Sequence, residues 1–421
     1  MPLSLSLTPE CRLVFAAAHV APDAAAIAEL ARQPLDWGRV IAIAEMERAT
    51  SPLWRVIERS FAGTVARGDG DNHAGGLLPR AAAEHLRRSA MVSDFRMLRL
   101  GARLQATLAA LRERDVPVLL LKGAAMASSF HDGFTDRPMT DVDLLVHRAD
   151  VPRAREAIIE SGWPETTDPV LLSLLKDQHH LPHFVDPEPT GLRIELHTML
   201  LPPDQPFVLD AERPWATARP AAAPFGNALV AEPHFLLLHA CLHFAWSHTM
   251  RFGAWRTFRD ASALVRSPAF NWDDFVALAR ETKGLTSCYW TLRLARRLSG
   301  VDVPPEVMRA LAPPTSERVC RGLERHFISA IAPGEAPPCP SVKIARMLWL
   351  AALRPRWSGH ADAGRIDPEH RWERARGTAS TETLPQRVAR HTRGIRYWWD
   401  FAARTLLTLS PPRPRGTPTP Q

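Results

Sequence analysis

Long hydrophobic runs, closely spaced cysteines and a leader-like N-terminus are all missing from this chain of 421 residues. No stretch of about 18 uncharged apolar residues occurs, which argues against a transmembrane helix. The first residues lack a basic stretch ahead of the apolar ones, so they do not resemble a signal peptide. The five cysteines are scattered without a Cys-x-x-Cys spacing, which argues against the common zinc and redox motifs. We therefore expect reduced thiols in a cytoplasmic protein.

Lysine is also scarce, because only four of the 52 basic residues are Lys. The first of them precedes a glycine, in the pair Lys122-Gly123. A compact ammonium group suits a point contact to phosphate, whereas the guanidinium group of Arg presents a wide planar fork. Because almost all other basic residues of the chain are Arg, the use of Lys at this turn favours a phosphate contact here.

The positive charge is concentrated near the C-terminal end. Residues 354–421 hold thirteen Arg and six Asp or Glu, and this difference equals the whole net charge of +7. A basic segment of this kind can meet RNA, an anionic membrane surface or no particular partner. Nucleic acid is therefore a candidate partner through this tail.

Two carboxylates open an apolar strand pattern in the run Asp141-Val-Asp-Leu-Leu-Val146. Side chains at positions i and i+2 of a strand point to the same face, so Asp141 and Asp143 should converge. Two adjacent carboxylates repel each other unless a cation lies between them. The pair therefore predicts a divalent metal, and the Lys-Gly turn before it adds nucleotide phosphates to the prediction.

A further carboxylate lies on the return strand of an expected hairpin. Residues 180–186 and 192–200 read as two strands joined by a turn rich in Pro and Gly. In the second strand the apolar residues alternate with Arg193, Glu195 and His197, which should share the other face. Glu195 is thus a candidate third metal ligand or base, and His197 a candidate substrate contact or a structural hydrogen-bonding group.

The order of elements predicts an α+β fold, in which a small mixed sheet is carried between helical regions. A long helix over residues 80–114 leads into a strand at 116–121 and a helix at 124–130. Helical patterns return after about residue 231. We expect four regions, which are an N-terminal helical region at 1–114, an α/β core at 115–230, a C-terminal helical domain at 231–332, and a linker, short helices and a basic Pro/Arg-rich tail at 333–421.

At this point the motifs resemble a known family. A strand, a Gly turn, a helix, an Asp-h-Asp-h strand (h is apolar) and a later acidic strand residue resemble the DNA polymerase beta-like nucleotidyltransferase superfamily. More narrowly, the chain looks like the bacterial uncharacterised nucleotidyltransferase family over roughly residues 8–300. The segments that carry this likeness are Leu119 to Met126, Arg137 to Val146, Ile194 to His197 and His239 to Asp260.

The resemblance implies a metal site and a reaction. Asp141 and Asp143 would hold one or two Mg²⁺ (or Mn²⁺) ions, and Glu195 would complete the site and orient or deprotonate an acceptor hydroxyl. The reaction would transfer an NMP, with AMP as one candidate, from an NTP to a hydroxyl of an unknown acceptor, releasing pyrophosphate. The acceptor could be a small molecule, a protein or RNA.

The resemblance also implies how the nucleotide is held. Gly123 and the backbone after it, at Ala124, would cradle the triphosphate, while Lys122 and Arg137 would neutralise its charge. The superfamily usually has Gly-Ser or Gly-Gly at this turn, but here Gly123 is followed by Ala124 and Ala125. A hydroxyl contact to phosphate is therefore missing.

Other interpretations of these signals remain open. Arg137 could instead pair with Asp136 or another nearby acid. His239 and His243, at i and i+4 of an expected helix, have a metal-compatible spacing, but a buried helix without a zinc site explains them as well. The whole chain could be a catalytically inactive nucleotide-binding or scaffold protein on the same fold, or a toxin-type enzyme that modifies RNA ends.

Overall fold

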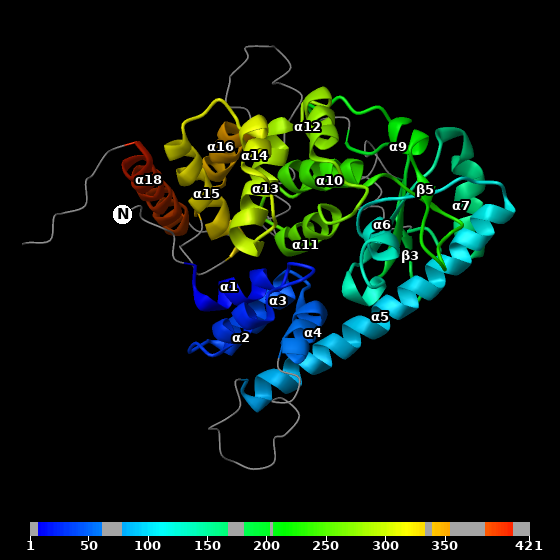
Figure 1. Cartoon of the computed structure of the whole chain (residues 1–421), viewed down its shortest axis with the longest axis horizontal. Helices are drawn as coiled ribbons and strands as arrows, with labels where there is room; N and C mark the ends of the chain where they lie inside the picture. The colour runs from blue at the N-terminus through cyan, green and yellow to red at the C-terminus, as the bar shows by residue number, and fades with distance from the viewer. Residues whose placement is uncertain are drawn as a thin grey trace, which may run out of the picture. The chain divides into compact units, whose positions relative to one another are not determined.

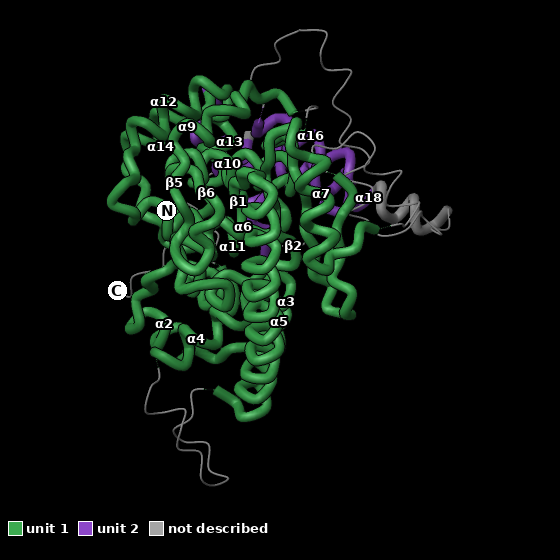
Figure 2. The backbone as a smooth tube through the Cα atoms, turned by 90° about the vertical axis from the view of Figure 1, so that its right-hand side faces the viewer, with its two compact units in different colours: residues 1–313, 360–366 green, residues 314–359, 367–421 purple. Residues whose placement is uncertain are grey.

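The computed structural model describes residues 7–60, 78–166, 181–202, 205–332, 339–353 and 384–406. The chain divides into two compact units, of which the first contains residues 1–313 and 360–366 and the second residues 314–359 and 367–421 (Figure 2). The expected division into four regions stays a prediction. None of the helices in the described ranges is long and apolar enough to cross a membrane.

Four helices open the first unit, as the sequence predicts: α1 (Pro9–Ala16), α2 (Ala24–Ala31), α3 (Trp37–Met46) and α4 (Thr50–Ser60). Side-chain caps define three of their starts, at Thr8, Asp23 and Asp36. The hydroxyl of Thr8 accepts a hydrogen bond from the backbone N–H of Cys11 at 3.4 Å, and Asp36 accepts one from Arg39 at 3.1 Å. Such caps satisfy backbone donors that the first helical turn leaves unpaired.

The long helix α5 (Arg80–Glu113) confirms the helix expected at 80–114. It contacts α4 near one end and α7 (Val151–Glu160) near the other, so it passes both the N-terminal helices and the sheet (Figure 1). Leu86, Leu100, Leu104 and Leu111 are fully buried along its packed face. The Gly-rich sequence at residues 67–78 predicts a loop before this helix, and almost all of these residues lie outside the described ranges.

Six strands form one mixed sheet in the order β3-β4-β2-β1-β6-β5, which confirms the α+β fold class. The neighbouring strands β2 and β4 are parallel, and β1 is antiparallel to β2 but parallel to β6. The β3–β4 pair is antiparallel, as the expected hairpin requires. The strands are β1 (Leu119–Leu120), β2 (Asp141–Leu145), β3 (Phe184–Val185), β4 (Arg193–His197), β5 (Arg219–Pro220) and β6 (Leu229–Val230).

Short helical segments connect these strands: α6 (Lys122–Ser129), the 3-10 turns η1 (Phe134–Asp136) and η2 (Arg148–Asp150), α7 and α9 (Arg213–Ala216). Helix α6 begins at Lys122, two residues earlier than the sequence predicts. The backbone N–H of Leu121 donates to the carbonyl of Asp143 at 3.0 Å, so the sheet pairing continues up to the helix. The start of α6 therefore lies directly beside β2.

The rest of the first unit is helical, with α10 (Pro233–Leu242), the π-helical turn η3 (His243–Ser247), α11 (Ala254–Leu264), α12 (Trp272–Glu281), α13 (Leu285–Ser299) and α14 (Pro305–Leu311). Phe235, Phe258 and Trp290 are fully buried in its core. The indole N–H of Trp255 donates to the carbonyl of Val14 at 2.8 Å, which ties α11 to the N-terminal helices. The described residues of the first unit thus form one connected body around the sheet.

The second unit contains α15 (Glu317–Ile331), α16 (Val342–Leu353) and α18 (Leu384–Leu406). Helices α15 and α18 pack closely, because a Cβ added at Gly322 would lie 2.4 Å from the hydroxyl of Thr405. The hydroxyl of Tyr397 hydrogen-bonds to Nδ1 of His326 at 2.9 Å. Much of the basic tail, at 354–383 and 407–421, lies outside the described residues.

Candidate metal and nucleotide site

The centre of the site is a group of three side chains on the parallel strands β2 and β4. The register pairs Asp143 with Glu195 and Leu145 with His197. Side-chain alternation then places Asp143, Glu195 and His197 on one face of the sheet. One ligand atom from each residue lies within 4.8 Å of the other two, and all three side chains are buried.

Lys122 is the cation next to this cluster. Its Nζ atom lies 2.6 Å from Oδ1 of Asp143. Burial opposes the charged ammonium group, but Asp143 and Glu195 outweigh it and raise the pKa of Lys122. Burial would likewise raise the pKa of Asp143, yet the charges and hydrogen bonds of Lys122 and His197 hold it well below its usual value. The pair is therefore charged at neutral pH.

His197 connects the two carboxylates. Its Nε2 atom lies 2.8 Å from Oδ1 of Asp143 and 3.8 Å from Oε2 of Glu195. Because an ionised carboxylate only accepts hydrogen bonds, Nε2 carries a proton in this arrangement. Burial lowers the pKa of His197, but the hydrogen bonds to Asp143 and Glu195 outweigh it, so the net shift is upward. His183 approaches the other oxygen of Glu195 at 3.2 Å.

Asp141 lies two residues before Asp143 on β2 and is half-buried. It is not part of the three-residue cluster among the described residues. The hydroxyl of Thr140 donates to Oδ1 of Asp141 at 3.2 Å, and Nη1 of Arg48 donates to the hydroxyl of Thr140 at 2.5 Å. Arg48 comes from the turn between α3 and α4, so the N-terminal helices reach the strand that carries both aspartates.

Arg137 belongs to one of two buried ion pairs that connect the segment before β2 with α11. Its Nε and Nη2 atoms each lie 2.7 Å from an oxygen of Asp260 on α11. The neighbouring residues pair in the opposite sense, because Nη2 of Arg259 lies 2.6 and 2.7 Å from the two oxygens of Asp136. His131 contacts Asp260 at 3.0 Å from the same loop. The fork of Arg137 is thus occupied by Asp260, not by Asp136.

Gly123 and Ala124 lie in the first turn of α6. A Cβ added at Gly123 would lie 3.3 Å from Sδ of Met139 and 3.6 Å from Nη1 of Arg137. The absence of a side chain at Gly123 therefore permits close packing of α6 on the segment that precedes β2. Ala124 is fully buried.

Histidines from α10 and η3 lie near the same ammonium group. Burial, together with the charge of Lys122, lowers the pKa of His239 to about 3, and burial and nearby cations lower that of His248 to about 3. Nε2 of His239 hydrogen-bonds to the carbonyl of Leu200 at 3.1 Å, which leaves this atom poorly placed for zinc. The π-helical turn begins at His243, and such turns are frequent at functional sites.

The donor set at the cluster is suited to a divalent cation. Carboxylate oxygens are the ligands that Mg²⁺ prefers, and an imidazole nitrogen extends the range to Mn²⁺ and other transition metals. Asp143 and Glu195 supply the oxygens, and His197 could supply the nitrogen only after Nε2 gives up the proton that it donates to Asp143. The residues present therefore fit a divalent metal ion.

Several residues around the site were not singled out by the sequence. Arg48, Arg256 and Asp260 lie far along the chain from the strand motifs, and His131 lies in the polar loop between them. Burial and the charge of Arg137 lower the pKa of Arg256 to about 10, and Asp141 partly offsets this. The one sequence signal among them was the resemblance of the segment from His239 to Asp260 to the nucleotidyltransferase family. That resemblance did not predict which residue pairs with Asp260.

Comparison with known proteins adds a family to this geometry. No curated protein and no solved structure matches the chain significantly. A family model described as uncharacterised nucleotidyltransferase matches residues 33–300, which is more than half of the chain and includes the sheet and the residues described above. The chain therefore belongs to the uncharacterised nucleotidyltransferase family.

Proposed function

We propose that this protein is a metal-dependent nucleotidyltransferase that moves an NMP from an NTP to a hydroxyl group of an acceptor. The observation that carries the proposal is the buried cluster of Asp143, Glu195 and His197 beside the ammonium group of Lys122. Carboxylates with a metal-ligand arrangement next to a lysine and a Gly turn are the groups that bind a metal nucleotide.

The chain's own residues would divide the work between nucleotide and acceptor. A divalent ion bound by Asp143, Glu195 and Asp141 would neutralise charge on the phosphates. The backbone of Gly123 and Ala124, at the start of α6, would face the triphosphate with N–H groups that the helix leaves unpaired. Lys122 would leave Asp143 to contact a phosphate oxygen, because a bound cation replaces its charge at that carboxylate.

Glu195 would orient the acceptor hydroxyl and accept its proton. Its carboxylate is close to His183, Arg193 and His197, at 3.2, 3.5 and 3.8 Å. These groups hold the carboxylate on the sheet face, where it can accept a proton as a general base. His197 would keep the two carboxylates in place and contact the substrate.

The same proposal includes the superfamily, the cellular setting, the nucleotide and the metal ion. We place the protein in the DNA polymerase beta-like superfamily and in bacteria, acting in the cytoplasm on ATP with Mg²⁺. Support comes from the strand, turn and Asp-h-Asp pattern, together with the family match. In this structure Arg137 supports the site through Asp260, so a phosphate contact by Arg137 would require that pair to open.

Labelled nucleotides test the type of transfer. ATP labelled on the α-phosphorus and ATP labelled on the γ-phosphorus are incubated with the full chain, Mg²⁺ and a cell extract. We expect stable labelling of an extract component from the α-label alone, with loss in Asp143→Asn but not in Asp274→Asn, an exposed carboxylate on α12. Labelling from the γ-label alone would indicate a kinase and would contradict the proposal.

One observation favours a second candidate, a catalytically inactive nucleotide-binding or scaffold protein. Asp143 is already neutralised by Lys122 and His197, and the turn has Ala124 where related turns carry Gly or Ser. An inactive protein would bind ATP without releasing pyrophosphate, whereas turnover would rule this candidate out.

The basic segment supports a version of the enzyme that modifies RNA ends. Its thirteen Arg and six acidic residues would attract the phosphate backbone. Deleting residues 385–421 should then weaken RNA binding and reduce its salt dependence. RNA binding that is unchanged by the deletion would count against this version.

A further inference from the structure

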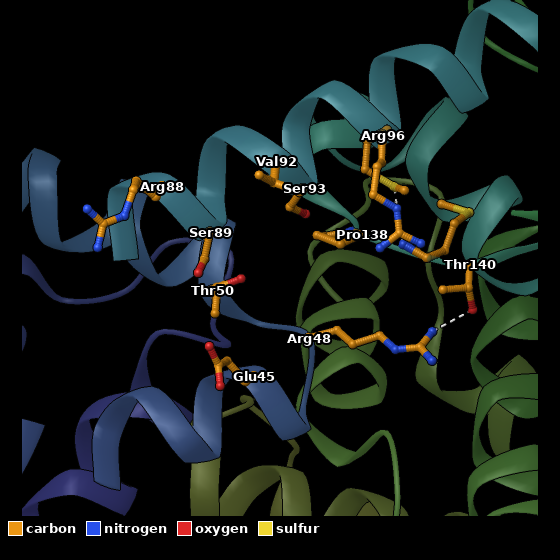
Figure 3. A pocket seen from close by; sticks show the side chains of 12 residues that line it. Glu45, Arg48, Thr50, Arg88, Ser89, Val92, Ser93, Arg96, Pro138 and Thr140 are labelled. Carbon is orange, nitrogen blue, oxygen red and sulfur yellow. Dashed lines mark hydrogen bonds between the residues drawn. The ribbon is translucent and has the colours of Figure 1, made fainter. Parts of the chain in front are cut away.

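A pocket lined by arginines and hydroxyl-bearing residues lies beside the strand that carries the aspartates. It has a volume of about 400 Å³ and lies between the turn from α3 to α4, the middle of α5 and residues 138–140 (Figure 3). Pockets of roughly 300–1,000 Å³ are typical of small-molecule sites. Its lining includes four hydroxyl-bearing residues and the guanidinium groups of Arg48, Arg88 and Arg96.

The pocket has an excess of positive charge. Within the described ranges, none of its three arginines forms an ion pair with a carboxylate. Arg48 donates to Thr140, and Arg96 donates to the carbonyl of Thr190. The single acidic residue in the lining, Glu45, is already bonded to His85 at 2.7 Å. Guanidinium groups without carboxylate partners, grouped around a cavity, are suited to an anionic ligand.

Two contacts connect this pocket to the proposed reaction centre. The hydroxyl of Thr140, which lines the pocket, accepts a hydrogen bond from Arg48 (Figure 3). The same hydroxyl donates to Oδ1 of Asp141. Met139 also lines the pocket, and its Sδ atom packs on Gly123. A ligand in the pocket therefore lies against Thr140 and Met139, and these two residues contact Asp141 and Gly123.

We infer that this pocket binds the acceptor, and that the acceptor is a small molecule carrying a phosphate group. A phosphate monoester offers three acceptor oxygens and up to two negative charges, which satisfies several arginine and hydroxyl donors better than a carboxylate does. The inference rests on the proposed nucleotidyl transfer. It selects a small phosphorylated acceptor over protein and RNA, because the volume is that of a small-molecule site.

The proposed transfer takes place in one step, in which one bond to phosphorus forms and one breaks. A hydroxyl oxygen of the bound acceptor forms a bond to the α-phosphorus of the NTP, and the bond from that phosphorus to the bridging oxygen breaks. Pyrophosphate leaves with the electron pair, and the hydroxyl proton passes to Glu195. The arginines would anchor the acceptor's phosphate, which itself does not react.

Orthophosphate is the probe for the pocket. Equilibrium dialysis of labelled orthophosphate is measured on the full chain saturated with Mg²⁺ and α,β-methylene-ATP, so that the nucleotide site is filled. Arg48→Gln and Arg88→Gln should each weaken orthophosphate binding about tenfold, the value of one charge-assisted contact. Arg87→Gln is the matched control, because Arg87 is the exposed neighbour of Arg88 on α5 and does not line the pocket.

The other results separate this inference from the proposed function. Equal orthophosphate binding by wild type and both pocket variants, or none by wild type, would overturn the inference. If the pocket variants lost the nucleotide analogue instead, the pocket would hold the triphosphate and the acceptor assignment would be wrong. If wild type bound orthophosphate through Arg48 and Arg88 but not the analogue, the proposed function would fail and the phosphate site would stand. Both arginines are exposed, so their variants should fold.

Discussion

Lys122 and Asp143 form an ion pair at the start of α6, with Nζ of the lysine 2.6 Å from Oδ1 of the aspartate. The backbone of Lys122 has a φ of +45°, a left-handed conformation that non-glycine residues rarely adopt. Such conformations cost on the order of 1–3 kcal/mol and often occur at functional sites. Through the ion pair, the ammonium group of Lys122 neutralises the negative charge of Asp143, which a bound metal ion would otherwise neutralise.

Replacing Lys122 shows how its ammonium group stabilises Asp143 and how it competes with a metal ion for the same carboxylate. In the metal-free protein Lys122→Met should lower the free energy of unfolding by about 3 kcal/mol, because it leaves Asp143 buried without its cation. Mn²⁺ should bind the variant more tightly, since the competing ammonium group is gone, and should restore part of the lost stability. Urea unfolding with and without Mn²⁺ measures both effects.

Lys283→Met provides the control for this substitution. Lys283 is exposed and has a φ of +60°, so it shares the backbone conformation of Lys122 without the buried partner. We expect little change in its stability and no change in Mn²⁺ binding. Equal effects of the two substitutions would show that the backbone conformation, not the ion pair, determines the result.

The crossed pairs between the 131–137 loop and α11 should be important for stability. Asp260→Ala removes the partner of Arg137 and leaves a buried guanidinium group, so the free energy of unfolding should fall by about 3 kcal/mol. Glu84→Ala, in an exposed pair with Arg80, should change stability little. Chemical denaturation of both variants measures the difference. A similar small change for Asp260→Ala would mean that the buried pair contributes no more than an exposed one.

The buried histidines predict how stability depends on pH. In the unfolded chain His239 binds a proton near pH 6.5, but burial lowers its pKa to about 3 in the fold. Between these values the unfolded state holds more protons, so stability falls as the pH falls. His239 alone should account for about 2 kcal/mol between pH 7 and pH 5.

His239→Gln tests this pH dependence. The substitution removes the titrating group, and its amide can still donate to the carbonyl of Leu200. Denaturant unfolding at pH 7 and pH 5 should therefore show a smaller loss of stability in the variant than in wild type. An identical loss in both proteins would contradict a buried neutral imidazole at this position.

The strand motifs allowed the sheet face to be predicted from sequence. Alternation in two apolar strands requires Asp143 and Glu195 to point away from the core, and the hairpin signal placed the second strand in the same sheet. The structure brings Asp143, Glu195 and His197 together. Asp141 could not be distinguished from Asp143 by this pattern, because the difference between them depends on Lys122 and Thr140.

The remainder of the site depends on contacts that no local pattern encodes. Arg137 and Asp260 are 123 residues apart, and a nearer acid, Asp136, was an equally reasonable partner from sequence. The pocket beside Thr140 is closed by α5 and by Arg48, which come from a region that the sequence describes only as helical. Long-range pairings of this kind follow from tertiary packing and not from periodicity.

Pyrophosphate release is the most direct test of the proposed nucleotidyl transfer. It is measured with each of the four NTPs and Mg²⁺ or Mn²⁺, with a cell extract as the source of acceptor. The wild-type chain should release pyrophosphate, and this release should vanish in the double variant Asp141→Ala/Asp143→Ala. The double variant Asp273→Ala/Asp274→Ala, which removes two exposed carboxylates from α12, should release pyrophosphate like wild type. Release that persists without Asp141 and Asp143, or wild type that binds an NTP and releases no pyrophosphate, would contradict the proposed transfer.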